Sequence, residues 1–238
     1  MTNGEIAQNN SKKIKIMITG LIVLILVLLV LTKFTPWRHI HNDGYEQGLG
    51  ITQWTNGTYY LTYMKTETDL PGYDDEPIKV PHSNLLQQTE YSDTAEYKLL
   101  SGLMFVNYIM IASIILCLAL LVCWMIDIKK KNCRLSIIFS VCLLIVIIIS
   151  SFGYYLIFPY GDVETEYYSS FSGYRSNDWS DWGTRHVLSW GPDIGFYLTI
   201  ISLILVCILV ALIISKRKIL RKESTPSSLT VPAVANFK

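Results

Sequence analysis

Charge is scarce in this 238-residue sequence, in which only 16% of the residues are Asp, Glu, Lys or Arg and 51% are hydrophobic. A typical soluble domain has about a quarter of its residues charged. The apolar residues also gather in four blocks instead of spreading along the chain. These features exclude a conventional soluble fold and a disordered chain, and they predict a membrane protein.

Cysteine and catalytic motifs are missing where an outer disulfide framework or an enzyme would need them. No cysteine lies in the long segments 33–98 and 159–193, so neither can hold a disulfide framework. The sequence has no phosphate-binding glycine loop, no Gly-x-Ser-x-Gly and no His-Glu-x-x-His, and no acid or histidine lies inside the apolar blocks. We therefore expect no enzyme activity, no cofactor and no nucleic-acid partner. Cys133, which lies beside basic residues, is a candidate for S-acylation.

Each apolar block is long enough to cross a bilayer, which takes about 20 residues of helix. The expected spans are 16–32, 99–126, 135–158 and 194–215. A secretory signal peptide is the alternative for the first block. Its apolar run exceeds the usual signal-peptide core and no small-residue cleavage site follows, so we expect it to be retained as a span.

The distribution of Lys and Arg orients these spans. Segments 1–15, 127–134 and 216–238 hold 13 of these bases and three acids, whereas 33–98 and 159–193 hold 7 bases and 16 acids. The positive-inside rule places both termini in the cytoplasm and the two long loops outside the plasma membrane. We expect the tail 216–238 to be disordered and its bases to contact anionic membrane lipids.

The first outer loop, 33–98, contains the strongest strand pattern. Asn56-Gly57 lies between two runs of β-branched and aromatic residues, which predicts a tight hairpin turn with Trp54 opposite Tyr59. Because an isolated hairpin is marginal in water, we expect residues 78–80 and strands of the second loop to join it. The predicted fold class is an all-α membrane protein: a four-transmembrane-helix bundle with a small extracellular β-sheet formed mainly by the first outer loop.

Aromatic side chains make both outer loops candidates for protein recognition, because rigid amphipathic rings supply contact area. The second loop, 159–193, is dense in Tyr, Trp, Ser, Gly and Asp. It either forms a recognition surface or packs on the first loop and the lipid headgroups. The candidate partner-binding residues are Trp54, Tyr59, Tyr60, Tyr63, Tyr168, Trp179 and Trp182.

Several polar patterns have both a chemical and a plainer interpretation. His39-x-His41-x-Asp43 on one strand face would suit Zn²⁺ or Cu²⁺, and Asp74-Asp75-Glu76 and 177–181 offer oxygens for Ca²⁺. Solvated polar loops are commoner than metal sites, so we predict no metal.

Two asparagines have other candidate roles. Asn56-Gly57-Thr58 is an N-glycosylation sequon at Asn56. Asn107, inside a span, is expected to hydrogen-bond between helices, with a substrate ligand as the alternative.

Three segments at the ends of the spans carry recognisable motifs. The first segment, after the first span, contains Trp37-Arg38, then Gly48-Leu49-Gly50 and Trp54. The second segment is 94–100, which leads into the second span and contains Lys98. The third segment opens the last span and reads Ser189-Trp190-Gly191-Pro192-Asp193-Ile194-Gly195-Phe196-Tyr197-Leu198. The first segment resembles the Trp-Arg and Gly-Leu-Trp signature of the claudin, peripheral myelin protein and calcium-channel γ-subunit superfamily. The second resembles the segment in which claudins carry a basic residue, here Lys98. The third resembles the Gly-Trp-Ser-Phe-Tyr entry into the last span and is most like that of the γ-subunits.

This resemblance implies a distant, non-enzymatic relative that engages another membrane protein, or a like copy, through its extracellular module. Adhesion, a scaffold role or an auxiliary-subunit role would all fit, and a small transporter or channel-forming subunit is the alternative. The first loop lacks the family's cysteine pair, and Asn236-Phe237-Lys238 differs from the Tyr-Val ending of many claudins. Tight-junction function is therefore not implied.

Overall fold

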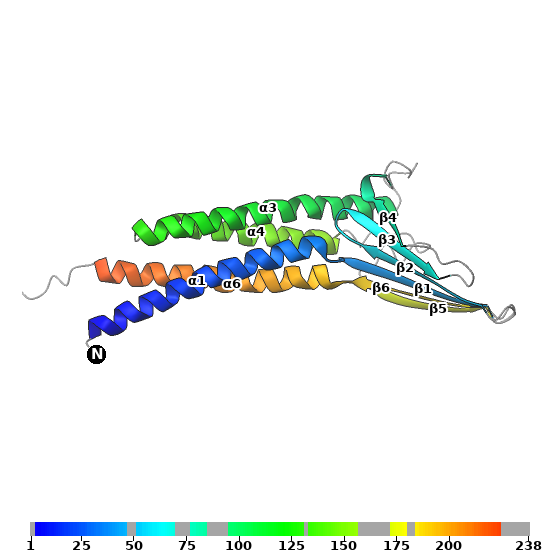
Figure 1. The fold of residues 1–238 in the computed structure, drawn as a ribbon, viewed down its shortest axis with the longest axis horizontal. Helices are drawn as coiled ribbons and strands as arrows, with labels where there is room; N and C mark the ends of the chain where they lie inside the picture. The colour runs from blue at the N-terminus through cyan, green and yellow to red at the C-terminus, as the bar shows by residue number, and fades with distance from the viewer. Residues whose placement is uncertain are drawn as a thin grey trace, which may run out of the picture.

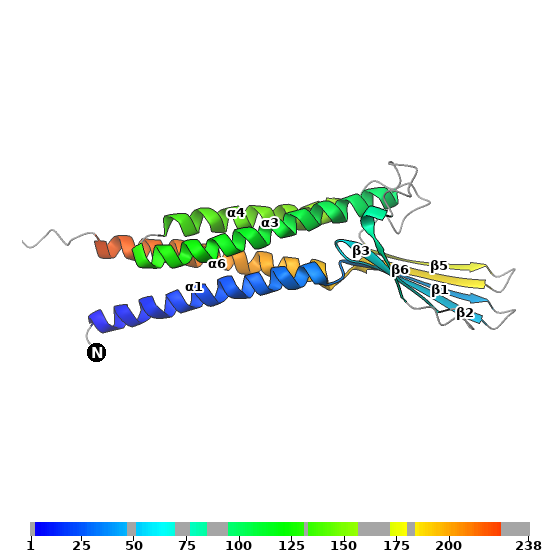
Figure 2. The ribbon, with the colours of Figure 1, turned by 45° about the horizontal axis from the view of Figure 1, so that its top comes forward.

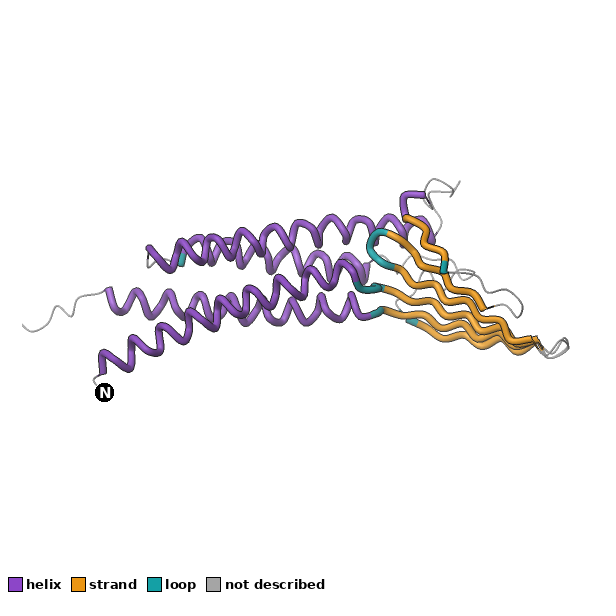
Figure 3. Tube along the Cα trace, viewed as in Figure 1, coloured by secondary structure: helices purple, strands orange, loops and turns teal. Residues whose placement is uncertain are grey.

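The structure, a computed structural model, describes residues 3–46, 51–69, 77–84, 95–130, 133–156, 172–179 and 184–224. Four long helices lie side by side, and a six-stranded antiparallel sheet projects from one end of them (Figure 1). The helices are α1 (Asn3–Phe34), α3 (Ala95–Lys130), α4 (Arg134–Leu156) and α6 (Ile194–Ser224). Helices and strands thus form separate parts of the molecule (Figure 3).

All four helices are long and apolar enough to cross a membrane, which agrees with the four predicted spans. Only 22–33% of the most apolar stretch of each helix is buried within the bundle. Large apolar side chains such as Ile16 and Ile115 therefore stay exposed, at 73% and 60%. Exposing such surface to water is unfavourable, whereas lipid chains cover it at no cost. These helices support a multi-pass transmembrane protein.

Helices α1, α3 and α6 extend beyond the predicted spans, and α3 does so by four residues at each end. α1 already begins at Asn3, and α6 continues to Ser224, so the prediction of disorder is wrong for residues 216–224. A helix satisfies its own backbone hydrogen bonds and does not have to stop where the apolar residues stop. Residues 225–238, the rest of the predicted tail, lie outside the described residues.

The helices form a ring in which α1 packs between α3 and α6, and α4 packs between the same two helices on the other side. Buried residues of α1 recur every three or four positions, as one face of a helix requires. These residues are Ile18, Ile22, Ile25 and Leu29. They meet a similar row on α3 that runs from Leu99 to Trp124.

The sheet joins strands from both long loops. The first loop supplies β1 (Arg38–Glu46), β2 (Ile51–Tyr59), β3 (Tyr63–Asp69) and β4 (Ile78–Pro81), and the second supplies β5 (Gly173–Trp179) and β6 (Thr184–Pro192). Their order is β4-β3-β2-β1-β6-β5, so β1 and β6 connect the two loops. The predicted strand at 78–80 and the predicted main contribution of the first loop are confirmed.

The predicted turn at Asn56-Gly57 is wrong. β2 runs straight through these residues, and the β1–β2 ladder ends at the pair Glu46 and Ile51. Each central residue of β2 then has a partner on both sides, from β1 and from β3. Two flanking ladders satisfy more backbone groups than a short hairpin would, and so they override a local turn preference.

The register gives the sheet two different faces, because alternate residues point to opposite sides. The core face carries Arg38, Ile40, Tyr59, Met64 and Trp190. The polar face carries His39, His41, Asp43, Trp54, Asn56, Thr58, Lys65, Glu67, Tyr174 and Ser189. Trp54 and Tyr59, predicted to oppose each other, lie on opposite faces.

The two ends of the bundle differ in their neighbours. At the sheet end, the strands project away from the helices (Figure 2). At the other end lie the N-terminus and the last turns of α6 (Figure 1). We call this the basic end, because it carries Lys12, Lys13, Lys15, Lys129, Arg134, Lys216, Arg217 and Lys218.

Candidate functional site

Trp37 fixes the sheet to the helices. It is fully buried, and its indole Nε1 donates a hydrogen bond to the Thr32 carbonyl at 2.9 Å. Its backbone N–H donates to the Tyr59 carbonyl at 2.8 Å, and its own carbonyl accepts from the Asp193 N–H at 2.9 Å. The Tyr154 hydroxyl donates to the same carbonyl at 2.8 Å, and the two rings pack edge to face with centroids 5.3 Å apart. One residue thus ties α1, α4, β2 and the start of α6 together.

The start of α6 is shaped to receive this tryptophan. Gly195 donates its N–H to the Pro36 carbonyl at 2.7 Å. A Cβ at Gly195 would lie 2.6 Å from the Trp37 ring, so the close approach requires glycine. Arg38 is fully buried beside Trp37 and forms a hydrogen bond with the Tyr154 hydroxyl. Two of the motifs singled out in the sequence, one after the first span and one before the last, therefore meet at this junction.

A hydrogen-bonded cluster lies on the polar face around His41. Its Nδ1 contacts the Asn56 side-chain oxygen, and its Nε2 lies 2.9 Å from an Asp43 carboxylate oxygen. The hydrogen bond with Asn56 is the main cause that raises the pKa of His41, and the carboxylate of Asp43 raises it further. His39 instead has its Nδ1 3.7 Å from the carboxylate of Asp193. The three residues of the His39-x-His41-x-Asp43 pattern thus share a face but turn to different partners, and no group of three such ligands gathers among the described residues.

Two tyrosines that were predicted to bind a partner, Tyr60 and Tyr63, lie together at the turn between β2 and β3. The rings of Tyr60 and Tyr63 stack with centroids 4.4 Å apart, and Nζ of Lys79 lies 5.8 Å from the centroid of the Tyr63 ring. Burial is the main cause that raises the pKa of Tyr60. On the strand that follows, Lys65 pairs with Glu67. This corner therefore combines aromatic area with charge.

The other predicted partner-binding residues differ in their burial and in whether the structure describes them. Trp54 lies half-buried on the polar face, but Tyr59 is only 2% exposed on the core face, so its prediction as a contact residue is wrong. Trp179 is the last residue of β5, where only the backbone is described, and Tyr168 and Trp182 lie outside the described residues. Tyr174, on the polar face and 65% exposed, belongs to the aromatic second loop but was not among the candidate partner-binding residues. Strand alternation would have found it once β5 and β6 were known to pair.

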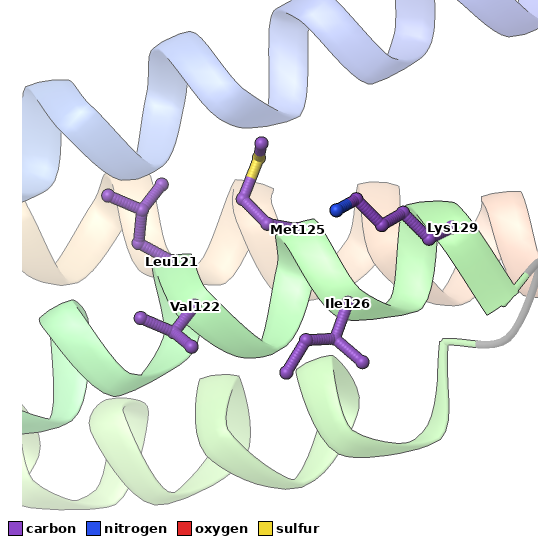
Figure 4. Close-up of a pocket in the computed structure, with 5 residues that line it drawn as sticks. All are labelled: Leu121, Val122, Met125, Ile126 and Lys129. Carbon is purple, nitrogen blue, oxygen red and sulfur yellow. The ribbon is translucent and has the colours of Figure 1, made fainter.

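Inside the bundle, Asn107 is 9% exposed and its side-chain oxygen finds no hydrogen-bond partner within the described part of the chain. A hollow of about 330 Å³ lies on the membrane-facing side of α3 near the basic end (Figure 4). It is lined by Leu121, Val122, Met125, Ile126 and Lys129. A single charge beside four apolar side chains suits a hydrocarbon chain better than a polar substrate.

Comparisons with known proteins add no family to this picture. No protein-family model matches the chain, and no curated protein matches it. The polar face of the sheet, held by the Trp37 junction, is therefore the candidate functional site on structural grounds.

Proposed function

We propose that this chain is a non-enzymatic, claudin-like protein of the plasma membrane that engages another membrane protein, or a second copy, through its sheet. In this proposal the sheet is extracellular and both termini are cytoplasmic. The polar face of the sheet is the observation that carries the proposal. It combines an exposed tyrosine, a tryptophan and hydrogen-bonding groups on a flat surface, as protein-binding surfaces do.

Rigidity of the support favours this function. A binding surface gains affinity when little conformational freedom is lost on association. The Trp37 junction anchors the inner strands β1, β2 and β6 to three helices through short hydrogen bonds. The polar face is therefore held in one orientation relative to the membrane.

The charge distribution supports the orientation. The basic end and the sheet end are opposite ends of the bundle (Figure 1). The loops that build the sheet hold 16 acids and 7 bases, whereas the remaining connecting and terminal segments hold 13 bases and three acids. The positive-inside rule then assigns the basic end to the cytoplasm.

Thiol labelling tests this topology in intact cells with an impermeant reagent. A cysteine at Ser83, which is exposed beside β4, should react, and one at Ser224, the last residue of α6, should not. Labelling at Ser224 but not at Ser83 would reverse the proposed orientation.

A small transporter or channel-forming subunit is the alternative. Such a protein needs a polar path, but the described hydroxyls inside the helices mostly donate to carbonyls of their own helix. Ser113, Ser151, Thr199 and Ser202 all bond to the carbonyl four residues earlier. These groups are satisfied without a solute, which favours the binding function. Reproducible solute or ion flux through liposomes containing the purified protein would favour the alternative instead.

Site-specific photocrosslinking tests the binding function directly. A benzophenone amino acid at Tyr174, 65% exposed on the polar face, is compared with one at Ile78, 60% exposed on the core-face register of β4. We expect a discrete adduct at Tyr174 that is lost with Trp54→Ala, and none at Ile78. Differently tagged copies identify a second copy as the partner. Equal adducts at both positions, or none at Tyr174, would refute the proposal.

A further inference from the structure

The basic end contains a buried cation to which the described residues offer neither a hydrogen-bond acceptor nor a carboxylate. Lys216 of α6 is only 5% exposed, and its Nζ finds no hydrogen-bond partner among the described residues. Within the part of the chain that the structure describes, no carboxylate lies within ion-pair distance of this ammonium group. Burying an unpaired charge is among the costliest arrangements in a protein, so this lysine calls for an anion.

Aromatic contact accounts for only part of its surroundings. Nζ of Lys216 lies 4.9 Å from the centroid of the Trp124 ring on α3, within the range of a cation–π interaction. Trp124 is itself held in place, because its Nε1 donates to the Thr19 hydroxyl at 2.9 Å. A ring face attracts an ammonium group but offers none of the acceptors that its three N–H groups need.

The acid of this region, Asp127, already accepts hydrogen bonds from another residue. Asp127 is 3% exposed, and its Oδ2 accepts hydrogen bonds from the Ser136 backbone N–H at 2.9 Å and the Ser136 hydroxyl at 2.7 Å. It therefore caps the first turn of α4. Cys133, 3% exposed, also borders the cluster, but burial raises the pKa of its thiol and keeps it neutral. Neither residue supplies the missing negative charge.

Further positive charge surrounds the same place. Lys15 of α1, half-buried, is close enough for its charge to act on Lys216, and Arg217 is close enough to act on Cys133. The cluster lies where the apolar stretch of α6, Ile194–Lys218, ends. In a bilayer-spanning bundle this level is that of the lipid headgroups.

We propose that Lys216, packed against the Trp124 ring and within reach of the positive charge of Lys15, binds an anionic phosphate group at the basic end of the bundle. The phosphate belongs either to a lipid headgroup or to a free phosphate compound, and its oxygens supply the acceptors that the protein lacks. This site does not depend on the function proposed for the sheet.

The test uses the purified full chain in vesicles of phosphatidylcholine alone or with phosphatidylserine, and a titration of inorganic phosphate into the first preparation. Thermal unfolding and the amount of co-purified anionic lipid are the readouts. The variant is Lys216→Met, and Lys218→Met is the matched control, because Lys218 is exposed and lies only two residues further along the same helix, on its other side. In pure phosphatidylcholine we expect Lys216→Met to unfold at a higher temperature than the parent protein, since a buried unpaired charge is gone.

With phosphatidylserine the parent protein should gain stability and retain the lipid, Lys216→Met should retain at least tenfold less, and Lys218→Met should change less than twofold. A gain from inorganic phosphate that requires Lys216 would support the same site with a free phosphate as its ligand. Equal losses in the two variants would mean diffuse attraction to basic residues, and no dependence on Lys216 in either arm would mean no site. Either result would overturn the proposal.

Discussion

Both ends of the bundle contain a buried tryptophan that is tied to α1, but the two tryptophans have different neighbours. At the sheet end, Nε1 of Trp37 donates to the Thr32 carbonyl at 2.9 Å, and at the basic end, Nε1 of Trp124 donates to the Thr19 hydroxyl at the same distance. Trp37 is surrounded by peptide groups and a tyrosine hydroxyl that bond to one another. Trp124 instead faces the ammonium group of Lys216, for which the described part of the chain supplies no hydrogen-bond acceptor.

This difference follows from what each end must do. At the sheet end the chain leaves the helix, so its backbone groups need partners close to the membrane, where unsatisfied groups are expensive. The Trp37 junction provides these partners and leaves little room for movement. At the basic end α1 and α6 continue past Lys15 and Lys216, so their backbone groups are already satisfied there and side chains can keep unused bonding capacity for a ligand.

Among the substitutions that test this difference between the two ends, the largest loss of stability is expected at Gly195. Gly195→Val places side-chain atoms into the Trp37 ring, 2.6 Å from the new Cβ, and against the Pro36 carbonyl at 2.9 Å. Both neighbours are held in place, so we expect a loss of about 3 kcal/mol or more, at the upper end of overpacking effects. Thermal unfolding of the purified protein and protease resistance of the sheet measure it.

Gly20→Ala is the control for that experiment. Nothing lies within 4 Å of a Cβ at Gly20 on α1, and alanine favours a helix by about 1 kcal/mol over glycine. This variant should be at least as stable as the parent. A Gly195→Val protein with an equally resistant sheet would show that the junction is not rigid.

A smaller effect at the same junction is expected from Tyr154→Phe. This change removes the hydroxyl that donates to the Trp37 carbonyl but leaves that carbonyl bonded to the Asp193 N–H. The loss should be about 1 kcal/mol, the usual worth of one hydrogen bond. Tyr108→Phe, at a tyrosine that is 63% exposed, is the control and should change stability little. Equal effects in thermal unfolding would contradict the role given to the Tyr154 hydroxyl.

The sequence predicted the helices better than the sheet, for a physical reason. A membrane span is visible in a single continuous stretch of residues, and the described residues of all four predicted spans are helical. The pairing of β1 with β6, by contrast, joins residues such as Ile40 and Trp190 that are far apart in the sequence. No local pattern encodes such a pairing, and the local pattern that was strongest, Asn56-Gly57, indicated a turn inside a continuous strand.

The candidate sites show the same limit. Trp54 lies half-buried on the polar face, and its predicted role in partner binding stays a prediction. Tyr59 is part of the core, because the register differs from that of the predicted hairpin. Lys216 was assigned to a disordered tail, because a lysine after an apolar run is usually a solvated anchor. Its burial depends on α1 and α3 packing around the end of α6, which only the assembled bundle reveals.

A substitution at Gly57 is expected to have a small effect of opposite sign: it should stabilise the sheet, whereas the changes at Gly195 and Tyr154 should destabilise the junction. Gly57 lies in the middle of β2, and a Cβ there would meet only ordinary contacts at 3.7–3.9 Å, from Tyr59 and Ile40. Gly57→Val should therefore be tolerated and should stabilise the sheet by up to about 1 kcal/mol, because glycine is a weak strand residue. Protease resistance of the sheet measures the change. Disruption by this variant would restore the hairpin turn at Asn56-Gly57 and refute the observed register.

The smallest expected effect is a pH dependence confined to the sheet end. His82 follows β4 and is fully buried, with its Nε2 bonded to the Tyr60 carbonyl at 2.7 Å. A nitrogen that faces a carbonyl must carry the proton, so Nε2 is already protonated and Nδ1 is the atom that takes up a second proton. Nδ1 is buried, and it has no hydrogen-bond partner among the residues that the structure describes. Burial, only partly opposed by the Tyr60 contact, lowers the pKa of His82. The unfolded chain, with a histidine pKa of about 6.5, then binds protons more readily than the folded chain.

Stability contributed by His82 should accordingly be complete above about pH 6.5 and should fall as the pH drops toward the lower folded-state pKa. His41 has the opposite sign, because its pKa is raised and its contribution is lost as the pH rises through the folded-state value. His82→Gln should therefore remove a loss of sheet stability at acidic pH, and His41→Gln should make that loss larger. Protease resistance of the sheet between pH 5 and 8 compares the two variants, with fluorescence unfolding of the helices in the same samples as the control. If both variants shift the profile in the same direction, the different environments assigned to the two histidines are wrong.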